Sequence, residues 1–169
     1  MKYGIAAQLL SFVLPVTVLI IVPAGILRGT GEYPLGWGLP LVWDIISIAA
    51  GVALMACGLF LLSWTIQLFN NIGKGTLAPW SPTSKLVAIG PYRYVRNPMI
   101  NGVLITLLGE TLAFGSFGLL IWFLTFFIIN HIYFIVSEEP GLVKRFGDSY
   151  LEYKKNVPCW IPRLKPWEG

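Results

Sequence analysis

Long apolar stretches separated by short polar segments dominate this chain. Four stretches run over residues 4–27, 41–69, 99–114 and 117–136, and each holds at most one ionisable side chain. A helix that crosses a bilayer needs about 20 mostly apolar residues. The pattern predicts an all-α fold, namely a polytopic membrane helix bundle of about four transmembrane helices in one integral-membrane domain, 1–169. The stretch 99–114 is shorter than a full span. Residues 99–136 could therefore form a re-entrant pair of helices instead of two transmembrane helices.

The connection between the last two stretches is very short. Gly115 and Ser116 are the residues that separate them. Glycine readily ends a helix and serine readily begins one. We therefore expect residues 99–136 to form a tight helical hairpin.

Composition supports a membrane protein and argues against other classes. Hydrophobic residues make up 56% of the chain, charged residues 12%, and the mean hydropathy is +0.71. Average soluble domains have about 25% charged residues. These values argue against a soluble enzyme, a disordered chain and a disulfide scaffold, and a net charge of +4 is too small for a nucleic-acid binder. The chain has no metal-binding motif, so we expect no metal.

The basic residues are distributed unevenly between the two sides of the predicted bundle. If four helices span, eleven of the twelve lysines and arginines fall on one side, and Arg28 alone falls on the other. Basic residues mark the cytosolic side of membrane proteins. We therefore expect both termini, the loop 70–98 and the tail 137–169 to be cytosolic, in an inner or plasma membrane.

The first polar cluster is Arg96-Asn97-Pro98. Proline suits the first turn of a helix and disfavours helical geometry in the residue before it, so Pro98 should begin a helix with Asn97 as its N-cap. The free amides of a helix N-terminus attract anions, and Arg96 adds a donor suited to a carboxylate. The alternatives are a purely capping Asn97 and an Arg96 that binds lipid headgroups.

The second polar cluster is Ser137-Glu138-Glu139-Pro140. By the same reasoning, the fourth helix should break at or just before Glu139. A cationic amphipathic helix should follow, lying on the inner leaflet or folding back on the loop. The two glutamates either cap that helix or bind a ligand while one of them pairs with Arg96. Its apolar stripe consists of Leu142, Phe146, Tyr150, Tyr153 and Val157.

Polar residues within the apolar stretches need partners, because unpaired polar groups are costly in a bilayer. In an antiparallel hairpin, Asn101 and His131 would share a depth near the cytosolic end. His131 then either bonds a helix backbone or Asn101, or contacts a ligand. Glu110 should lie nearer the other face, where it pairs with Arg28 or extends to the interface.

Residues 90–99, Gly-Pro-Tyr-Arg-Tyr-Val-Arg-Asn-Pro-Met, resemble a signature of the isoprenylcysteine carboxyl methyltransferase and phospholipid methyltransferase superfamily. Residues 138–158 resemble the closing signature of the same superfamily, and the likeness extends over roughly residues 50 to 163. Two departures stand out, since Asn97 replaces a more frequent histidine and Ile100 replaces a usual tyrosine. The resemblance is specific for the superfamily and leaves the substrate open.

The resemblance implies an integral-membrane enzyme that uses S-adenosylmethionine and binds it on the cytosolic side. Arg96 would be closest to the chemistry, as the catalytic residue. His131 joins the cofactor candidates because it lies on one helix face with Glu138. The expected cofactor-binding residues are Gly90, Tyr92, Asn97, Pro98, His131, Glu138 and Glu139.

The resemblance also implies a lipid bilayer as partner and a hydrophobic or lipid-anchored methyl acceptor. A carboxylate acceptor could be oriented by Arg96 without any base, whereas an amine would need a carboxylate or His131 to take its proton. Two alternatives remain at this stage. One is a nicotinamide-dependent membrane reductase of the sterol-reductase type, and the other is a non-catalytic membrane scaffold.

Overall fold

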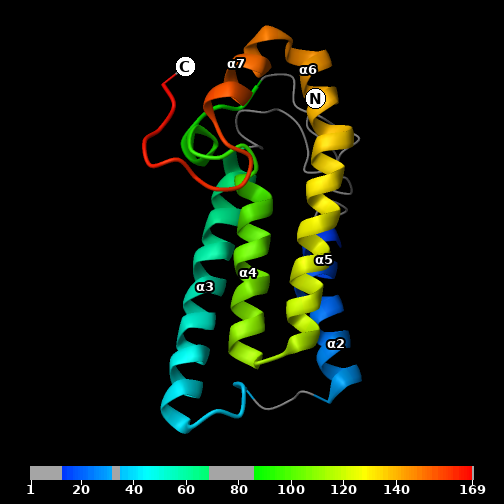
Figure 1. The fold of residues 1–169 in the computed structure, drawn as a ribbon, viewed down its shortest axis with the longest axis vertical. Coiled ribbons are helices and arrows are strands. Elements are labelled where there is room, and N and C mark those ends of the chain that lie inside the picture. The colour runs from blue at the N-terminus through cyan, green and yellow to red at the C-terminus, as the bar shows by residue number, and fades with distance from the viewer. Residues whose placement is uncertain (1–12, 32–34, 69–85, 169) are drawn as a thin grey trace.

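A computed structural model describes residues 13–31, 35–68 and 86–168, and every regular element in these ranges is a helix (Figure 1). The prediction of an all-α fold is therefore confirmed for the described residues. In chain order, the elements are η1 (Thr17–Ile21), α2 (Val22–Thr30), α3 (Leu41–Leu68), η3 (Gly90–Arg93), α4 (Pro98–Phe114), α5 (Phe117–Tyr133), η4 (Phe134–Glu138), α6 (Glu139–Phe146) and α7 (Asp148–Asn156).

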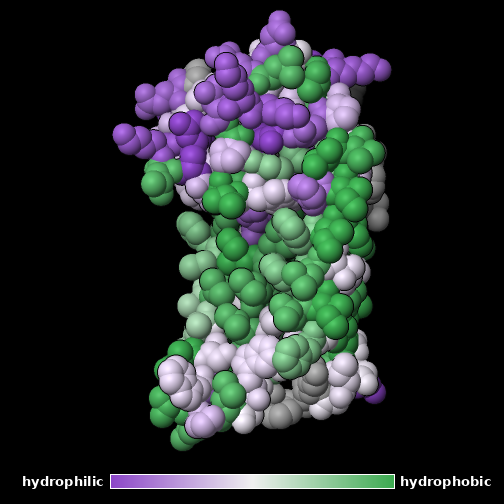
Figure 2. Space-filling view, in the orientation of Figure 1, coloured by the Kyte–Doolittle hydropathy of each residue, from purple (hydrophilic) through white to green (hydrophobic). Residues whose placement is uncertain are grey.

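The long helices form an apolar bundle suited to a bilayer. Three continuous helices, Val13–Thr30, Leu41–Leu68 and Phe117–Phe146, are long and apolar enough to cross a membrane. Helix α4 is apolar but has 17 residues, or about 26 Å at 1.5 Å per residue, against a hydrocarbon core of about 30 Å. Hydrophobic side chains cover the middle of the molecule, and hydrophilic ones crowd one end (Figure 2).

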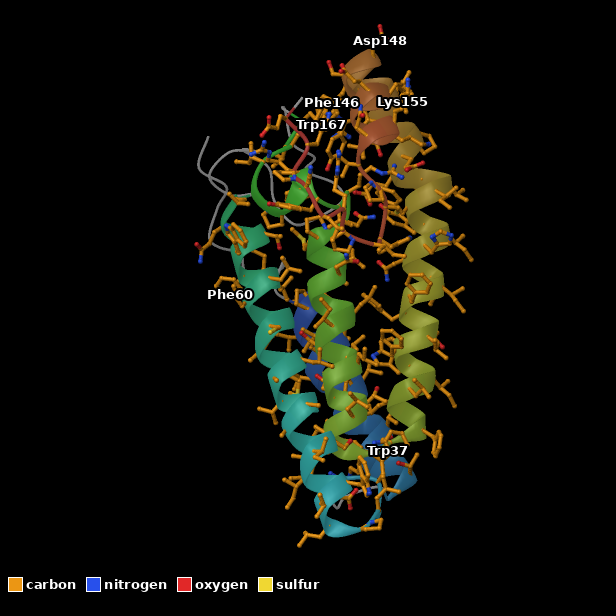
Figure 3. All side chains as sticks on the ribbon, turned by 60° about the vertical axis from the view of Figure 1, so that its left-hand side comes forward. Trp37, Phe60, Phe146, Asp148, Lys155 and Trp167 are labelled. Atoms are coloured by element: carbon orange, nitrogen blue, oxygen red, sulfur yellow. The ribbon has the colours of Figure 1, made fainter. Side chains whose placement is uncertain are left out.

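The two ends of the bundle differ in the residues they carry. Figure 3 places Trp37 at one end and Phe146, Asp148, Lys155 and Trp167 at the other. Arg28, in the last turn of α2, lies at the same end of the bundle as Trp37. All other described lysines and arginines belong to η3, α6, α7 or the irregular segments at the opposite end, which we call the polar end.

Helices α3 and α4 touch through glycines spaced seven residues apart on each helix. A Cβ atom added to Gly58 would lie 2.6 Å from the carbonyl oxygen of Gly102, and one added to Gly51 would lie 2.6 Å from that of Gly109. No side chain larger than hydrogen fits at such distances without moving the helices. This contact fixes the start of α4, and with it Arg96 and Asn97, against the last turns of α3.

The predicted hairpin between the last two helices is confirmed. Gly115 adopts a left-handed conformation with φ of 59° after α4, and the Ser116 Oγ accepts a hydrogen bond of 3.1 Å from the Leu119 amide. These are the expected roles of glycine at a helix end and of serine at a helix start. The short turn places α5 antiparallel beside α4 (Figure 1).

The expected helix break at Glu139 is wrong. Helix α5 continues through the π-helical turn η4 into α6, so the stretch predicted to end at 136 extends to Phe146. A proline lacks an amide proton and its ring collides with the carbonyl four residues earlier. The wider turn, in which the Glu139 amide bonds the Phe134 carbonyl, lets the helix continue through Pro140. The same device, η1, precedes Pro23.

The predicted amphipathic helix is split in two. Gly147 has φ of 54° and separates α6 from α7. The apolar stripe nevertheless has one buried face, because Tyr150, Tyr153 and Val157 form a cluster. This cluster packs against residues on both sides of it in the sequence, among them Leu86, Ala88, Phe146 and Trp167.

The segment 157–168, which we call the C-terminal strap, returns along the loop before α4. The Arg96 amide donates to the Pro158 carbonyl at 2.9 Å, and the Arg163 amide donates to the Tyr94 carbonyl at 3.0 Å. The Trp167 amide donates to the Arg93 carbonyl, also at 3.0 Å. The strap and the loop thus hold each other over the polar end of the bundle.

Candidate active site

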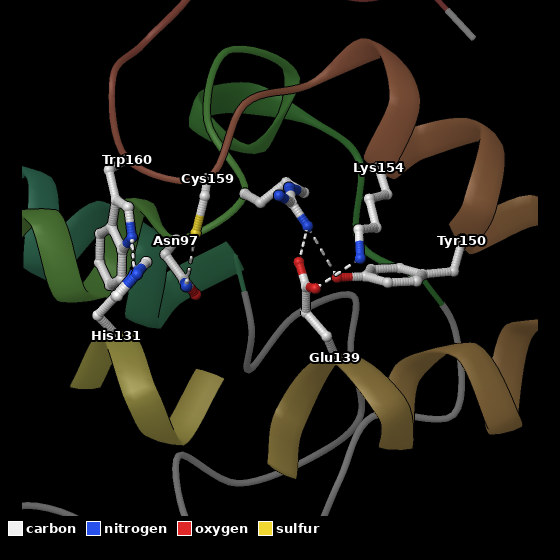
Figure 4. A network of polar contacts seen from close by, with 8 residues as sticks. Asn97, His131, Glu139, Tyr150, Lys154, Cys159 and Trp160 are labelled. Carbon is white, nitrogen blue, oxygen red and sulfur yellow. Dashed lines mark hydrogen bonds and ion pairs between the residues drawn. The ribbon is translucent and has the colours of Figure 1, made fainter. Parts of the chain in front are cut away.

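A buried ion cluster joins the loop before α4 to helices α6 and α7 (Figure 4). Arg96 donates through Nη1 to Oε1 of Glu139, and the Lys154 Nζ lies 2.7 Å from Oε2 of the same carboxylate. The side chains of Arg96 and Glu139 are only 10% and 9% exposed. Of the two alternatives for the glutamates, the structure favours the one in which a glutamate pairs with Arg96, and that glutamate is Glu139. Both of its oxygens are therefore engaged within the protein.

Arg96 is held on several sides, but its buried Nε bonds none of the described residues. Its Nη1 lies 3.4 Å from the Tyr150 hydroxyl, and its guanidinium carbon lies 5.5 Å from the centre of the Phe134 ring. Burial works to lower the pKa of Arg96, but the Tyr150 hydroxyl and the Glu139 charge outweigh it and raise the pKa. Arg96 is thus a permanently charged donor facing an unfilled hydrogen-bonding position.

The two adjacent glutamates occupy different environments. Glu139 is buried, whereas Glu138 is exposed. Glu138 forms no ion pair with any residue in the described ranges. Of the two, Glu138 therefore has the carboxylate that is available to a ligand.

Trp160, from the C-terminal strap, bridges two helices. Its carbonyl accepts a hydrogen bond of 2.8 Å from the Asn101 side chain, and its indole N–H donates to Nδ1 of His131 at 2.9 Å (Figure 4). Its ring also meets Phe127 edge-on, with centres 5.3 Å apart. Asn101 and His131 are thus connected through Trp160, which the sequence did not single out. Because Nδ1 of His131 accepts this hydrogen bond from Trp160, it carries no proton, and the ring proton lies on Nε2.

Asn97 occupies the predicted N-cap position of α4, but its side chain does not form the predicted hydrogen bond. Helix α4 begins at Pro98 with Asn97 at the N-cap position, yet the Asn97 side chain makes no capping hydrogen bond. It is buried, and its Nδ2 lies 3.9 Å from the Cys159 sulfur. Burial raises the pKa of the Cys159 thiol, which makes it a neutral neighbour.

Gly90 and Tyr92 connect the loop to other elements. Gly90 has φ of 55°, and a Cβ there would lie 2.9 Å from the Leu68 side chain at the end of α3. The Tyr92 carbonyl accepts a hydrogen bond of 2.7 Å from the Tyr153 hydroxyl of α7. Their contacts therefore position the loop around Arg96.

An apolar cavity of about 490 Å³ lies between α3, α4, the loop before α4 and the strap. We call it the outer groove. Pro98 lines it, together with Leu61, Trp64, Pro91, Tyr94, Val95, Asn101, Leu104, Ile105, Trp160, Ile161 and Pro162.

The expected pairing of Glu110 is wrong, although Glu110 does lie near the Gly115 end of α4. Its side chain neither pairs with Arg28 nor extends to the interface, since Glu110 is 6% exposed and Arg28 is exposed. One carboxylate oxygen of Glu110 has no partner among the described residues. Helix α4 lies between α3 and α5, so this position faces the interior of the bundle (Figure 1).

Comparison with known families agrees with the resemblance of the two sequence signatures. The sequence profile of the family described as phospholipid methyltransferase matches residues 46–149. The chain belongs to this family. The matched range contains Arg96, Asn97, His131, Glu138 and Glu139, whereas Lys154 and Trp160 lie beyond it.

Relatives of named activity match parts of the chain. A protein-S-isoprenylcysteine O-methyltransferase of Schizosaccharomyces pombe is 41% identical over 82 residues, 47% of this chain and 34% of that protein. The human protein of the same name is 33% identical over 91 residues, 50% of this chain and 30% of that protein. Methanethiol S-methyltransferase 2 of Bradyrhizobium diazoefficiens is 34% identical over 77 residues, 43% and 27% of the two chains. The matches cover less than half of each relative, and no solved structure matches.

Proposed function

We propose that this protein transfers a methyl group from S-adenosylmethionine to a carboxylate on a hydrophobic or lipid-anchored acceptor. The observation that carries this proposal is Arg96, whose buried Nε has no partner among the described residues. An arginine in this state is matched by a carboxylate, which accepts two parallel hydrogen bonds from the guanidinium group. Membership of a methyltransferase family supports methyl transfer over the reductase and scaffold alternatives.

The residues around Arg96 fit the methyl donor. S-adenosylmethionine carries an ammonium group, ribose hydroxyls and a carboxylate, and when bound it supplies a methyl group on a positively charged sulfur. Glu138 is exposed and suits the ammonium or the hydroxyls. The half-buried ring of Trp160 suits a flat base or a cation. Glu139 acts through Arg96, which it orients and keeps charged.

The choice of a carboxylate over an amine as acceptor follows from the groups that could take a proton, because most of them already accept hydrogen bonds within the protein. Both oxygens of Glu139 bind cations, and Nδ1 of His131 accepts the Trp160 N–H. The described site therefore offers donors, and its one unengaged carboxylate, Glu138, is exposed. A carboxylate acceptor is already an anion at neutral pH, whereas an amine must first lose a proton. The O-methyltransferase relatives are consistent with this choice.

We also propose four spans, with both termini and the polar end in the cytosol of an inner or plasma membrane. The clustering of basic residues at the polar end supports this orientation. Helix α4 would be the fourth span, shortened by about 4 Å relative to the hydrocarbon core. A cytosolic polar end would give the site access to a soluble methyl donor.

The test compares binding and turnover in purified protein. Calorimetric titration should detect S-adenosylhomocysteine and not NADPH, and binding of NADPH alone would contradict the proposal. Methyl transfer is then measured with a carboxylic acid and a primary amine that share one long chain. Below the pKa of an amine, its rate rises tenfold per pH unit, while the rate with a carboxylate should stay flat between pH 6 and 9.

The role of Arg96 is tested with Arg96→Lys, which keeps the charge and loses the planar pair of donors. If Arg96 orients the acceptor, turnover should fall at least tenfold, while S-adenosylhomocysteine affinity changes by less than threefold. A large loss of that affinity instead would assign Arg96 to the carboxylate of the methyl donor. Unchanged turnover and affinity would remove Arg96 from the site.

A further inference from the structure

The C-terminal strap carries the two most exposed large hydrophobic side chains among the described residues. Leu164 is 99% exposed and Ile161 is 80% exposed. Neither residue belongs to a helix, so neither is part of a membrane-spanning segment. Arg163 lies between them and Lys165 follows them, so exposed apolar and basic residues alternate within five positions. This mixture is typical of segments that lie in the interface between a membrane and water.

The strap is held to the protein at both ends, while the side chains in its middle remain exposed. The Trp160 ring contacts that of Phe127, with centres 5.3 Å apart, and the Trp167 ring contacts that of Tyr153, with centres 5.4 Å apart. Backbone hydrogen bonds to the loop before α4 hold the strap between these contacts. The protein therefore fixes the position of residues 161–165 without covering their apolar side chains.

The strap lies where the apolar band of the bundle meets the polar end. Ile161 lines the outer groove together with Trp64, which is in the last turns of α3 and is 43% exposed. Figure 1 shows the strap extending sideways beyond α3, and Figure 2, in the same orientation, shows the hydrophilic end overhanging the hydrophobic band on that side. With the hydrophobic band in a bilayer, the strap therefore lies over the lipid headgroups beside α3.

The basic residues of the strap are not neutralised within the described part of the chain. Neither Arg163 nor Lys165 forms an ion pair there. Arg163 donates through Nη1 to the Asn156 carbonyl at 2.9 Å, which positions the guanidinium group and leaves its charge in place. The carboxylate of Glu168 lies 3.6 Å from Arg93, outside the strap. The strap thus offers two positive charges at the depth of the headgroups, where anionic phospholipids attract basic residues.

We propose that the C-terminal strap is an interfacial anchor for anionic phospholipids. Ile161 and Leu164 insert among the lipids beside α3, and Arg163 and Lys165 bind the headgroup phosphates. The bilayer is favoured over a soluble protein partner, because Ile161 continues a surface of α3 that already faces lipid. The bundle holds the strap at the membrane, so docking is intramolecular and needs few contacts. Each basic residue near an anionic surface strengthens docking about fivefold, so the two together contribute about 25-fold.

The first test places a polarity-sensitive fluorophore on the strap. In a background without the native cysteines, the fluorophore is attached to Leu164→Cys or, as a control, to Asp148→Cys at the tip of the polar end (Figure 3). One copy of the protein is held in each nanodisc, whose phosphatidylglycerol lipids carry bromine atoms near the start of their acyl chains. Bromine should quench the probe at position 164 at least threefold more than the probe at position 148. Equal quenching at the two positions would overturn the inference and leave the exposed side chains to a protein partner or a second copy.

The second test leaves the apolar side chains unchanged and measures amide hydrogen exchange of residues 161–167 in nanodiscs without bromine. Phosphatidylglycerol should slow this exchange at least fivefold relative to phosphatidylcholine, because a docked strap opens less often. Arg163→Gln combined with Lys165→Gln should remove the difference. Lys144→Gln combined with Lys155→Gln removes the same charge from exposed positions on α6 and α7 and should retain it.

Two results of the exchange experiment would overturn the inference. One is equal exchange in the two lipids for the unmodified protein, and the other is a lipid-dependent slowing that survives the loss of both Arg163 and Lys165. Neither test contains a methyl donor or acceptor, so the outcome for the strap is independent of the proposed methyl transfer.

Discussion

Glu138 and Glu139 are adjacent, but the structure predicts opposite consequences for the same substitution. Glu139→Gln removes the charge that both Arg96 and Lys154 use. Breaking a buried ion pair costs about 3–5 kcal/mol, and glutamine keeps one acceptor oxygen, so we expect a loss of about 2–4 kcal/mol. Lys154 adds less than about 1 kcal/mol, because its side chain is 43% exposed. Glu138→Gln is the matched control for stability, since Glu138 is exposed and forms no described ion pair.

Thermal unfolding in one detergent measures the difference. For a chain of this size, 1 kcal/mol shifts the unfolding temperature by about 2–4 °C, so Glu139→Gln should lower it by roughly 5–15 °C. Glu138→Gln should leave it within about 2 °C and instead weaken S-adenosylhomocysteine binding about tenfold, the loss of one charged hydrogen bond. The reasoning is refuted if Glu139→Gln leaves the unfolding temperature unchanged and weakens that binding as Glu138→Gln does. Glu139 would then be a ligand contact rather than a support for Arg96.

Three further predictions concern packing, titration and orientation. Gly58→Ala should destabilise the bundle by about 1–3 kcal/mol in thermal unfolding, because its methyl group meets the backbone of α4, while Gly25→Ala, with open space around it, should be neutral or slightly stabilising. Burial raises the pKa of Tyr150 to about 12 from its ordinary 10. The free energy of unfolding that its neutral form contributes should therefore be lost as the pH rises from 10 to 12. Tyr150→Phe should flatten the plot of unfolding temperature against pH over that range. In a background without the native cysteines, an impermeant maleimide applied from outside the cell should label Thr30→Cys and spare Leu164→Cys, and the reverse would invert the proposed orientation.

Features that depend on local rules could be predicted from the sequence. The start of α4 at Pro98 follows from the fixed backbone angle of proline, and the turn at Gly115 and Ser116 follows from their helix-ending and helix-starting preferences. The pairing of Arg96 with one glutamate was one of two alternatives that the sequence left open, because adjacent glutamates at the mouth of a lipid-embedded bundle are costly unless they are paired. These inferences use few residues and no knowledge of the path of the chain between them.

Features that depend on distant contacts could not be predicted in this way. Trp160 bridges Asn101 and His131 only because the strap returns along the loop, and no periodicity in residues 157–168 indicates that path. The continuation of helix α5 through Pro140 was missed for a different reason. The proline rule is correct for a regular helix, but one π-helical turn provides the extra residue that removes the collision.

The polar cluster around Arg96 and the apolar outer groove lie close together at one end of this small chain. Glu139 binds Arg96 through one carboxylate oxygen and Lys154 through the other. The Arg96 guanidinium is therefore held in place without a ligand. Trp160 both lines the outer groove and donates its N–H to His131. The strap therefore contributes to an apolar surface and to a polar contact within a single residue. Because the strap is fixed by backbone hydrogen bonds to the loop that carries Arg96, the polar cluster and the groove keep a constant spacing, which is the condition for orienting a reactive group within reach of a methyl donor.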